Sequence, residues 1–303
     1  MRIATSQYHM TMSRTLQAAQ ARLEHVMQQM ATGQRVLLPS DDPVTTVRLS
    51  RIAREQAALS QYRDNIGALS VRLTQNETAL DAGLQDLQQA RDLLVWANDG
   101  ANTAADLNAM SSQMVSLRDS LFYTANSRDQ EGRYLFSGTA SETPTITYDA
   151  AAPAGSRYTF TGNTATQQVA VGNKITQPAN VSLPEMEALL NRLDLAAQTL
   201  QAPGVTMGDP ATAATLRAAL TGVDEAMHGL SARIAGLGGA QNILSTLDET
   251  HGNVGVAAQQ AVVTLSQLDY GEAAIRLAGY TTALQATQKA YVRVSGLSLF
   301  NQL

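Results

Sequence analysis

The side chains that most often carry catalysis or bind metals are few in this sequence and stand far apart. Its four histidines are His9, His25, His228 and His251, and none belongs to an H-E-x-x-H pair, the helical spacing that binds zinc in many hydrolases. The chain has no cysteine, so disulfides, zinc–thiolate sites and thiol catalysis are excluded. The histidines therefore predict no metal centre, and His251 is expected to be a packed side chain.

Asp41 and Asp42 form a carboxylate pair, which in other settings binds a metal or provides an acid and a base. Nothing nearby supplies a histidine or a third carboxylate. Asp42 instead precedes Pro43, and this order favours the start of an α-helix, because the carboxylate caps free N–H groups and complements the helix dipole. We therefore interpret the pair as part of a helix cap.

No motif for phosphate binding or acyl transfer is present. The sequence lacks a G-x-S-x-G elbow and a P-loop, and the glycines within 236–239 lie between helical patterns rather than after a strand. The net charge is −5, and no basic run with interleaved aromatic residues tracks a phosphate backbone, which disfavours nucleic acid as a partner. We expect no enzyme activity, cofactor or metal.

Neither end of the sequence resembles a membrane or targeting segment. No N-terminal stretch has the basic start and apolar core of a cleaved secretory signal. No apolar run approaches the ~18 residues that cross a bilayer. These features alone predict a cytosolic protein without a membrane partner.

The residues that organise the chain are apolar and repeat at every seventh position. Within the stretch from Pro43 to about Trp96, the row consists of Leu59, Ile66, Leu73, Leu80, Leu87 and Leu94. This spacing places them on one face of a helix and predicts a coiled-coil stripe. Such a helix is roughly 80 Å long at about 1.5 Å per residue, so it needs equally long partners. The C-terminal half supplies matching positions at Leu244, Leu247, Val254 and Leu265.

These patterns predict a mainly α fold, an elongated antiparallel helical rod with a small β-rich inserted domain and helical N- and C-terminal arms. A return helix is expected from Leu107 to about Gln130, short strands within 145–171, and a possible helix break at 236–239. The predicted divisions are 1–42 for the N-terminal coiled-coil arm and connector, 43–138 for the N-terminal rod helices, 139–202 for the β-rich insert, 203–268 for the C-terminal rod helices, and 269–303 for the C-terminal coiled-coil arm.

Both arms carry apolar stripes of their own. The positions that we expect to mediate assembly are Leu16, Leu23 and Val26 in the first arm and Leu277, Leu284 and Tyr291 in the second. Isolated helices of this length are marginal in water. We therefore expect both arms to be largely mobile in a free monomer and to become ordered when copies of the chain pack together.

The connector between the first arm and the rod reads Thr-Gly-Gln-Arg-Val-Leu-Leu-Pro-Ser-Asp-Asp-Pro over residues 32–43. It resembles the N-terminal signature of the flagellin-like hook-associated proteins, and the proline after the acid pair is typical of members at the hook–filament junction. The connector positions that carry the resemblance are Gly33, Pro39, Asp41, Asp42 and Pro43. Further similar segments are 132–139, 233–242, 268–277 and 297–303.

The resemblance implies a structural subunit of the bacterial flagellum, located outside the cell at the junction between hook and filament. It implies export in an unfolded state without a cleaved signal, which would replace the cytosolic expectation. The implied partners are other copies of the chain in a tube, the adjacent hook-associated protein, flagellin, and a cytoplasmic export chaperone at the C-terminal arm. A flagellin filament subunit is the nearest alternative. A type III secretion needle-tip or translocator protein and an enzyme on a flagellin-like scaffold are more distant ones.

Overall fold

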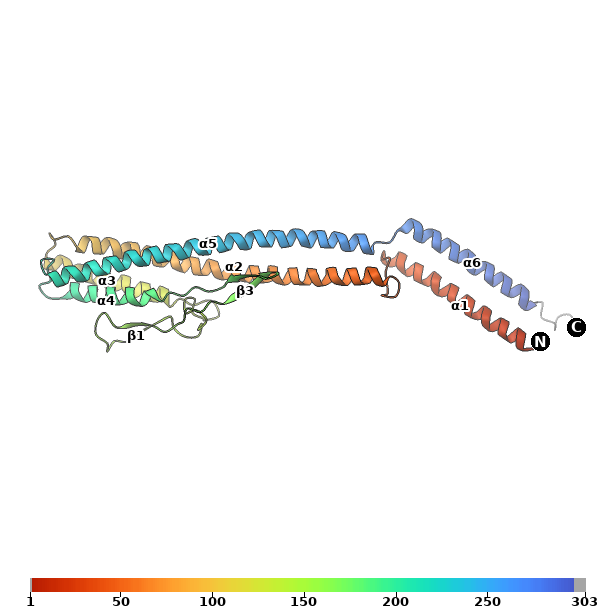
Figure 1. Cartoon of the computed structure of the whole chain (residues 1–303), viewed down its shortest axis with the longest axis horizontal. Coiled ribbons are helices and arrows are strands. Elements are labelled where there is room, and N and C mark those ends of the chain that lie inside the picture. Colours follow the sequence, from red (N-terminus) through yellow and green to blue (C-terminus); the bar gives the residue numbers. More distant parts are fainter. Residues whose placement is uncertain (1, 297–303) are drawn as a thin grey trace. The chain divides into compact units, whose positions relative to one another are not determined.

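Six helices make up most of the chain in the computed structural model, which describes residues 2–296 and the side chains of residues 6–293 (Figure 1). The helices are α1 (Arg2–Thr32), α2 (Pro43–Ala97), α3 (Ala104–Ala125), α4 (Glu185–Gln201), α5 (Pro210–Ser266) and α6 (Tyr270–Gly296). The mainly α class with long antiparallel helices, a small β-rich part and helical ends is confirmed. The similar segment 297–303 lies outside the described residues.

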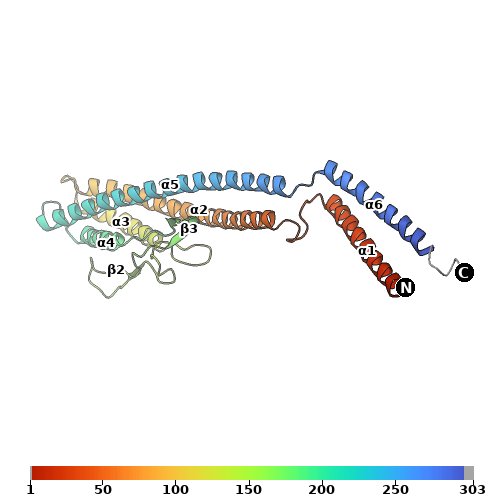
Figure 2. The same cartoon turned by 45° about the vertical axis from the view of Figure 1, so that its right-hand side comes forward.

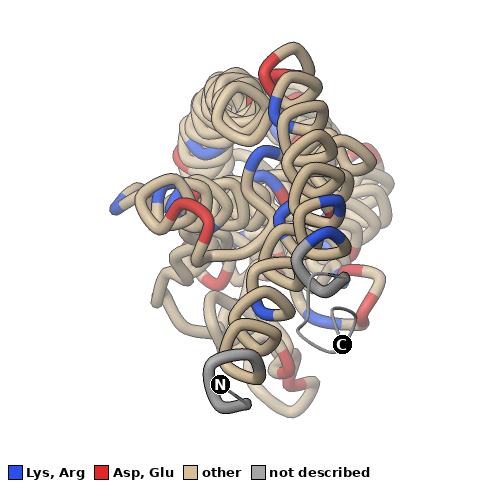
Figure 3. The backbone as a smooth tube through the Cα atoms, turned by 90° about the vertical axis from the view of Figure 1, so that its right-hand side faces the viewer, with Lys and Arg blue, Asp and Glu red and all other residues tan. Residues whose placement is uncertain are grey.

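The chain divides into two compact units. We call residues 1–58 and 253–303 the arm unit and residues 59–252 the bundle unit. Helices α2 and α5 pass through both, so the units divide within these helices and not at the boundaries predicted from sequence. The predicted five-part division stays a prediction. Acidic and basic residues are interspersed along the chain (Figure 3).

In the bundle unit, α2 and α5 lie side by side in opposite directions (Figures 1 and 2). Two ion pairs mark their register, Arg63 with Asp248 and Arg91 with Asp224, each with a shortest nitrogen-to-oxygen distance of 2.8 Å. The apolar positions of both helices face a shared core, as heptad spacing requires. The long helices therefore supply one another's buried partner.

Helices α3 and α4 complete a bundle in which successive helices alternate in direction. Ser120 of α3 donates a hydrogen bond of 2.6 Å to Asp86 of α2. Asn108 near the start of α3 donates one of 2.5 Å to the Leu200 carbonyl near the end of α4. The side chains of Leu189, Leu190 and other α4 residues belong to the same core as α2 and α5. The segment predicted as a separate insert thus contributes part of the bundle's interior.

Two small antiparallel hairpins form the β-rich part. Strand β1 (Ile146–Tyr148) pairs with β2 (Tyr158–Phe160), and β3 (Gln168–Gly172) pairs with β4 (Ile175–Pro178). The sequence pattern predicted the first three strands but not β4, whose side chains are mostly exposed and follow no alternating burial. Strands without a buried face carry a weak sequence signal.

Helix α3 ends at Ala125, several residues earlier than predicted. Its C-terminal neighbour Asn126 is held by the first hairpin, because its side chain donates to the Ile146 carbonyl at 3.0 Å and accepts from the Ile146 N–H at 3.1 Å. This side chain replaces the next helical turn with a contact to β1.

Helix α5 is continuous across the glycines of 236–239, where a break was thought possible. None of these glycines adopts a positive φ angle. Leu237 and Leu244 are 6% and 1% exposed, so the helix buries the same face before and after the glycines. Glycine costs a helix about 1 kcal/mol per residue, and this burial outweighs that cost.

Candidate assembly surfaces

The arm helices α1 and α6 meet along a narrow apolar seam. Its buried residues are Val26, Leu268 and Ala273, each no more than 3% exposed. Farther along, His9 and Tyr291 join the helices through a hydrogen bond of 3.0 Å. Of the predicted assembly positions, Val26 is buried, and the others lie half-buried: Leu16, Leu23, Leu277, Leu284 and Tyr291.

Large apolar side chains remain exposed on the arm helices. Met10 and Met27 on α1 are 57% and 54% exposed, and Ile275 on α6 is 75% exposed. A contact between two helices covers one stripe on each and leaves the outer faces in water. The described arm unit therefore has apolar surface that its own helices do not cover.

The two connectors are joined to each other by backbone hydrogen bonds. The Arg35 N–H donates to the Ser266 carbonyl at 2.8 Å, and the Leu268 N–H donates to the Gly33 carbonyl at 2.9 Å. Between them, Gln34 and Gln267 form an antiparallel bridge. The entry into α2 and the exit from α5 are thus fixed against each other.

Arg35 and Tyr270 strengthen this joint, and the sequence analysis missed both. The Arg35 guanidinium donates to Asp42 at 3.2 Å, to the Thr45 hydroxyl at 3.1 Å and to the Leu265 carbonyl at 3.4 Å. A cation at the last carbonyls of α5 also complements that helix dipole. Tyr270 donates to the Met30 carbonyl at 3.2 Å. The sequence did contain one signal for the role of Arg35, namely an arginine in a short connector that precedes two acidic residues.

Gly33 adopts a φ angle of +69° beside Tyr270. A Cβ atom at this position would lie 3.2 Å from the Tyr270 hydroxyl oxygen. Both the left-handed backbone and the close approach favour glycine here. Gly33 is therefore the end of α1 and part of the packing at the joint.

The predicted acid pair acts through backbone contacts. Asp41 accepts hydrogen bonds from the Leu38 and Leu37 N–H groups at 2.9 and 3.0 Å, and the Leu38 N–H lowers the pKa of its carboxyl. Asp42 accepts from the Thr45 N–H at 3.0 Å and the Thr45 hydroxyl at 2.7 Å, and the Thr45 N–H lowers the pKa of Asp42. Asp42 thus lies at the cap of α2.

The other connector residues are more exposed. Pro39 lies in an exposed turn, and Pro43 opens α2. The His25 imidazole lies 3.6 Å from an Asp41 oxygen, so this contact links α1 to the connector.

Most of the predicted rod-packing positions lie in the bundle core. Those that are buried are Ile66, Leu73, Leu80, Leu87, Leu94 and Leu244. Leu59, Leu247 and Leu265 are half-buried. Val254, however, is 40% exposed, so its assignment to the packed row was wrong. It lies in the part of α5 that belongs to the arm unit, where much of its side chain stays in solvent.

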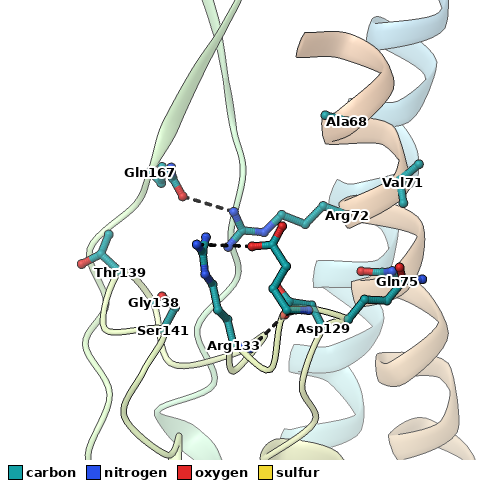
Figure 4. Close-up of a pocket in the computed structure, with 12 residues that line it drawn as sticks. Ala68, Val71, Arg72, Gln75, Asp129, Arg133, Gly138, Thr139, Ser141 and Gln167 are labelled. Atoms are coloured by element: carbon teal, nitrogen blue, oxygen red, sulfur yellow. Dashed lines mark hydrogen bonds and ion pairs between the residues drawn. The ribbon is translucent and has the colours of Figure 1, made fainter. Parts of the chain in front are cut away.

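The bundle unit also contains a polar pocket of about 650 Å³ (Figure 4). Arg72 donates to Gln167 at 3.2 Å across it, and Arg133 pairs with Glu131 at 3.3 Å. Arg72 thus binds an amide and Arg133 a carboxylate, while the buried Nε atom of Arg72 has no hydrogen-bond partner in the structure. Within residues 2–296, no three His, Asp or Glu side chains gather as metal ligands.

Comparison with known proteins shows similarity to flagellar proteins. The family model for the bacterial flagellin N-terminal helical region matches residues 3–141. Over 99% of both chains, the protein is 28% identical to flagellar hook-associated protein 3 of Escherichia coli strain K12. The similarity to hook-associated protein 3 thus extends over the whole chain. The resemblance inferred from the connector is thereby confirmed.

Two further comparisons refine the assignment. A solved flagellar hook-associated protein from Vibrio parahaemolyticus, described as putative, superimposes with a TM-score of 0.66 at 28% identity, covering 74% of this chain and 99% of that one. Flagellin A of Vibrio cholerae is also 28% identical, but over only 44% of this chain and 35% of its own length. The similarity of this chain to flagellin is therefore partial, whereas its similarity to hook-associated protein 3 covers the whole chain. No described helix of the chain is long and apolar enough to span a membrane.

Proposed function

We propose that this chain is a structural subunit of the bacterial flagellum that forms the junction between hook and filament. The observation that carries the proposal is the similarity to flagellar hook-associated protein 3 over 99% of both chains. Similarity to flagellin stops after less than half of the chain. A filament subunit would be expected to match flagellin at both ends.

The arm unit supplies a physical reason for assembly. Its two helices bury a short seam and leave residues such as Met27 and Ile275 in water. Packing several copies around these helices would bury this surface and add favourable free energy. We infer that the arms order fully when copies of the chain come together in a tube.

The neighbours of this subunit follow from the same proposal. A second hook-associated protein lies on one side of the junction, flagellin lies on the other, and an export chaperone binds the C-terminal arm in the cytoplasm. The chain is exported unfolded and without a cleaved signal. The absence of cysteine suits this route, because no disulfide has to form before or after export.

Deletion of the gene in its own bacterium tests the proposal. Electron microscopy should show hooks without filaments, and the medium should contain free, unattached flagellin. The gene supplied in trans should restore filaments. Loss of all flagellin from both cells and medium, with chaperones and export unaffected, would instead identify the chain as the filament subunit.

A further inference from the structure

Helix α2 presents a solvent-exposed face of mixed acidic and apolar character near its C-terminal end. Asp92, Val95 and Trp96 are spaced at i, i+3 and i+4, which places them together on one side of the helix, and the exposed Asp99 follows in the loop directly after α2. Val95 and Trp96 are 48% and 58% exposed, and Trp96 is the single tryptophan of the chain. We call these four residues the tip face.

The surroundings of the tip face are acidic. The loop of residues 98–103 and the loop of residues 202–209 lie at the same end of the bundle, because the helices alternate in direction. No Lys or Arg occurs within residues 92–117 or 193–216, whereas Asp106 and Asp209 add to the negative charge. The C-terminal end of a helix is stabilised by nearby cations, so the negative charge of Asp99 does not stabilise α2.

The N-terminal part of the same helix has a face of the opposite charge. Val44, Val47, Arg48 and Arg51 have the spacing i, i+3, i+4 and i+7. The two valines are 64% and 66% exposed, and both arginines are exposed. We call these four residues the base face.

The charges of both faces are available for a partner. Within the described residues, Arg48, Arg51 and Asp92 form no ion pair, and the Asp99 carboxylate accepts a hydrogen bond from the Ala101 N–H of its own loop. By contrast, the neighbouring Arg91 is paired with Asp224 at 2.8 Å. Exposed tryptophan and arginine are the side chains most often found at the centre of protein interfaces.

We propose that the tip face of one molecule docks on the base face of a second copy. Two aspartates then meet two arginines, while Trp96 and Val95 cover Val44 and Val47. The contact joins different surfaces of the two copies, so it repeats from molecule to molecule and does not close as a dimer. The proposal rests on the proposed self-assembly and adds to it a surface outside the arm helices.

The size of the two faces sets the strength of this contact. Four residues on each side bury less than the ~1,000 Å² typical of a stable interface, so most molecules in dilute solution are monomeric. When the arms already hold copies together, the second contact becomes intramolecular and is strengthened.

The single tryptophan provides a direct readout on the full-length protein. In low salt, from about 1 μM to about 1 mM protein, Trp96 emission should move to shorter wavelength as molecules associate, with sedimentation reporting larger species. High salt should weaken the shift, because it screens the four charges. An emission maximum that stays constant over this range would overturn the proposal.

Charge reversal distinguishes this docking from other association. The variants D92K/D99K and R48E/R51E should each lose the shift, because tip and base then carry like charges. An equal mixture of the two should regain it, since a basic tip can meet an acidic base. The control D64K/D81K makes the same change in net charge as D92K/D99K at exposed positions outside both faces and should behave as the unaltered chain.

Circular dichroism establishes whether each variant is folded. If D92K/D99K does not fold, D92N/D99N replaces it, and R48Q/R51Q replaces R48E/R51E in the same way. Each of these neutral variants should weaken the emission shift. Association that persists in both reversed variants would overturn the proposal. So would a shift that occurs only after another flagellar subunit is added. Failure of the proposed function would show differently, as filaments that form normally in the deletion strain.

Discussion

The imidazole of His251 lies against the ring of Tyr62, with 5.7 Å between the two centroids, across the seam between α5 and α2. Its Nε2 atom donates a hydrogen bond of 2.8 Å to the carbonyl of Val171 in β3. Asn65, one turn along from Tyr62, donates to the Ala170 carbonyl at 2.8 Å. The seam histidine that heptad spacing predicted as a packed residue therefore also fastens the second hairpin to the helix pair.

Replacing His251 with Ala should destabilise the bundle by about 1–3 kcal/mol, because the buried Val171 carbonyl loses its donor. Urea unfolding measures the free energy, and hydrogen exchange should show faster exchange in β3 and β4. His228 is exposed and serves as the matched control. Equal effects of H251A and H228A would contradict a fastening role.

Leu80→Ala should cost about 2–5 kcal/mol, because it leaves a cavity in the core. Leu80→Asp should cost more, since it places an unpaired charge there. Thermal unfolding of the full chain provides the comparison, with the exposed Gln88→Ala as control. Equal melting temperatures for L80A and Q88A would contradict the assignment of Leu80 to the core.

The ion pairs of the bundle should differ strongly in their contributions. Asp194 is 1% exposed and lies 2.6 Å from Arg118 and 3.5 Å from Arg157. Asp194→Ala removes this buried carboxylate from both arginines, although Arg118 keeps Asp119 at 2.8 Å, and should cost about 3–5 kcal/mol. Asp224 and Arg91 form an exposed pair, and Asp224→Ala should cost no more than ~1 kcal/mol. Denaturant unfolding of both variants tests this order, and similar losses would contradict it.

Acid should loosen the connector. The pKa values of Asp41 and Asp42 are lowered from 3.8 in the folded protein, so the folded state binds fewer protons than the unfolded chain. Their stabilisation is complete above the unfolded pKa and is lost as the pH falls through the lower folded value. Protection of the Leu37 and Leu38 amides, corrected for intrinsic exchange, should fall below about pH 4.

The Asp41→Asn variant is the control for this pH dependence. It removes the titrating carboxylate that accepts the two amide hydrogen bonds, so its connector should show a flatter dependence of protection on pH. A dependence as steep as that of the unaltered chain would assign the effect to another group.

Hydrogen exchange on a dilute monomer should also separate the arms from the bundle. Leu16, Leu23, Leu277 and Leu284 are only half-buried, so their amides should exchange fast, whereas those of Leu73 and Leu87 should be protected. Sedimentation confirms the monomeric state. Strong protection of all four arm residues would show that the arm pair is stable without assembly.

Heptad spacing predicted α2 closely, because Asp42 and Pro43 mark its start and every seventh residue from Ile66 to Leu94 faces one core. It misplaced Val254, because a repeat shows which residues are apolar but not which of them another element covers. The insert looked separate for a similar reason. The composition of the insert indicates turns and short strands. It does not indicate that α4 packs on α3, because that packing depends on contacts between residues far apart in the sequence.

The connector signature identified the right segment but not its contacts. Asp41 and Asp42 follow local cap chemistry, which a sequence displays. Arg35 reaches Leu265, and the Gly33 carbonyl accepts from Leu268, contacts that span most of the chain and leave no periodic pattern. Such contacts are seen only in the three-dimensional structure, where the two connectors lie side by side.

The bridge between the connectors has a consequence for the timing of folding. Gly33 and Arg35 find their partners at Leu268 and Ser266, and Gln56 meets Gln259, so the first helices pair with residues made near the end of synthesis. Contacts this distant close large loops and form late. A chain emerging from the ribosome would hold α1 and the first part of α2 without these partners until the end of α5 appears, which gives cytoplasmic factors time to bind this segment before it folds.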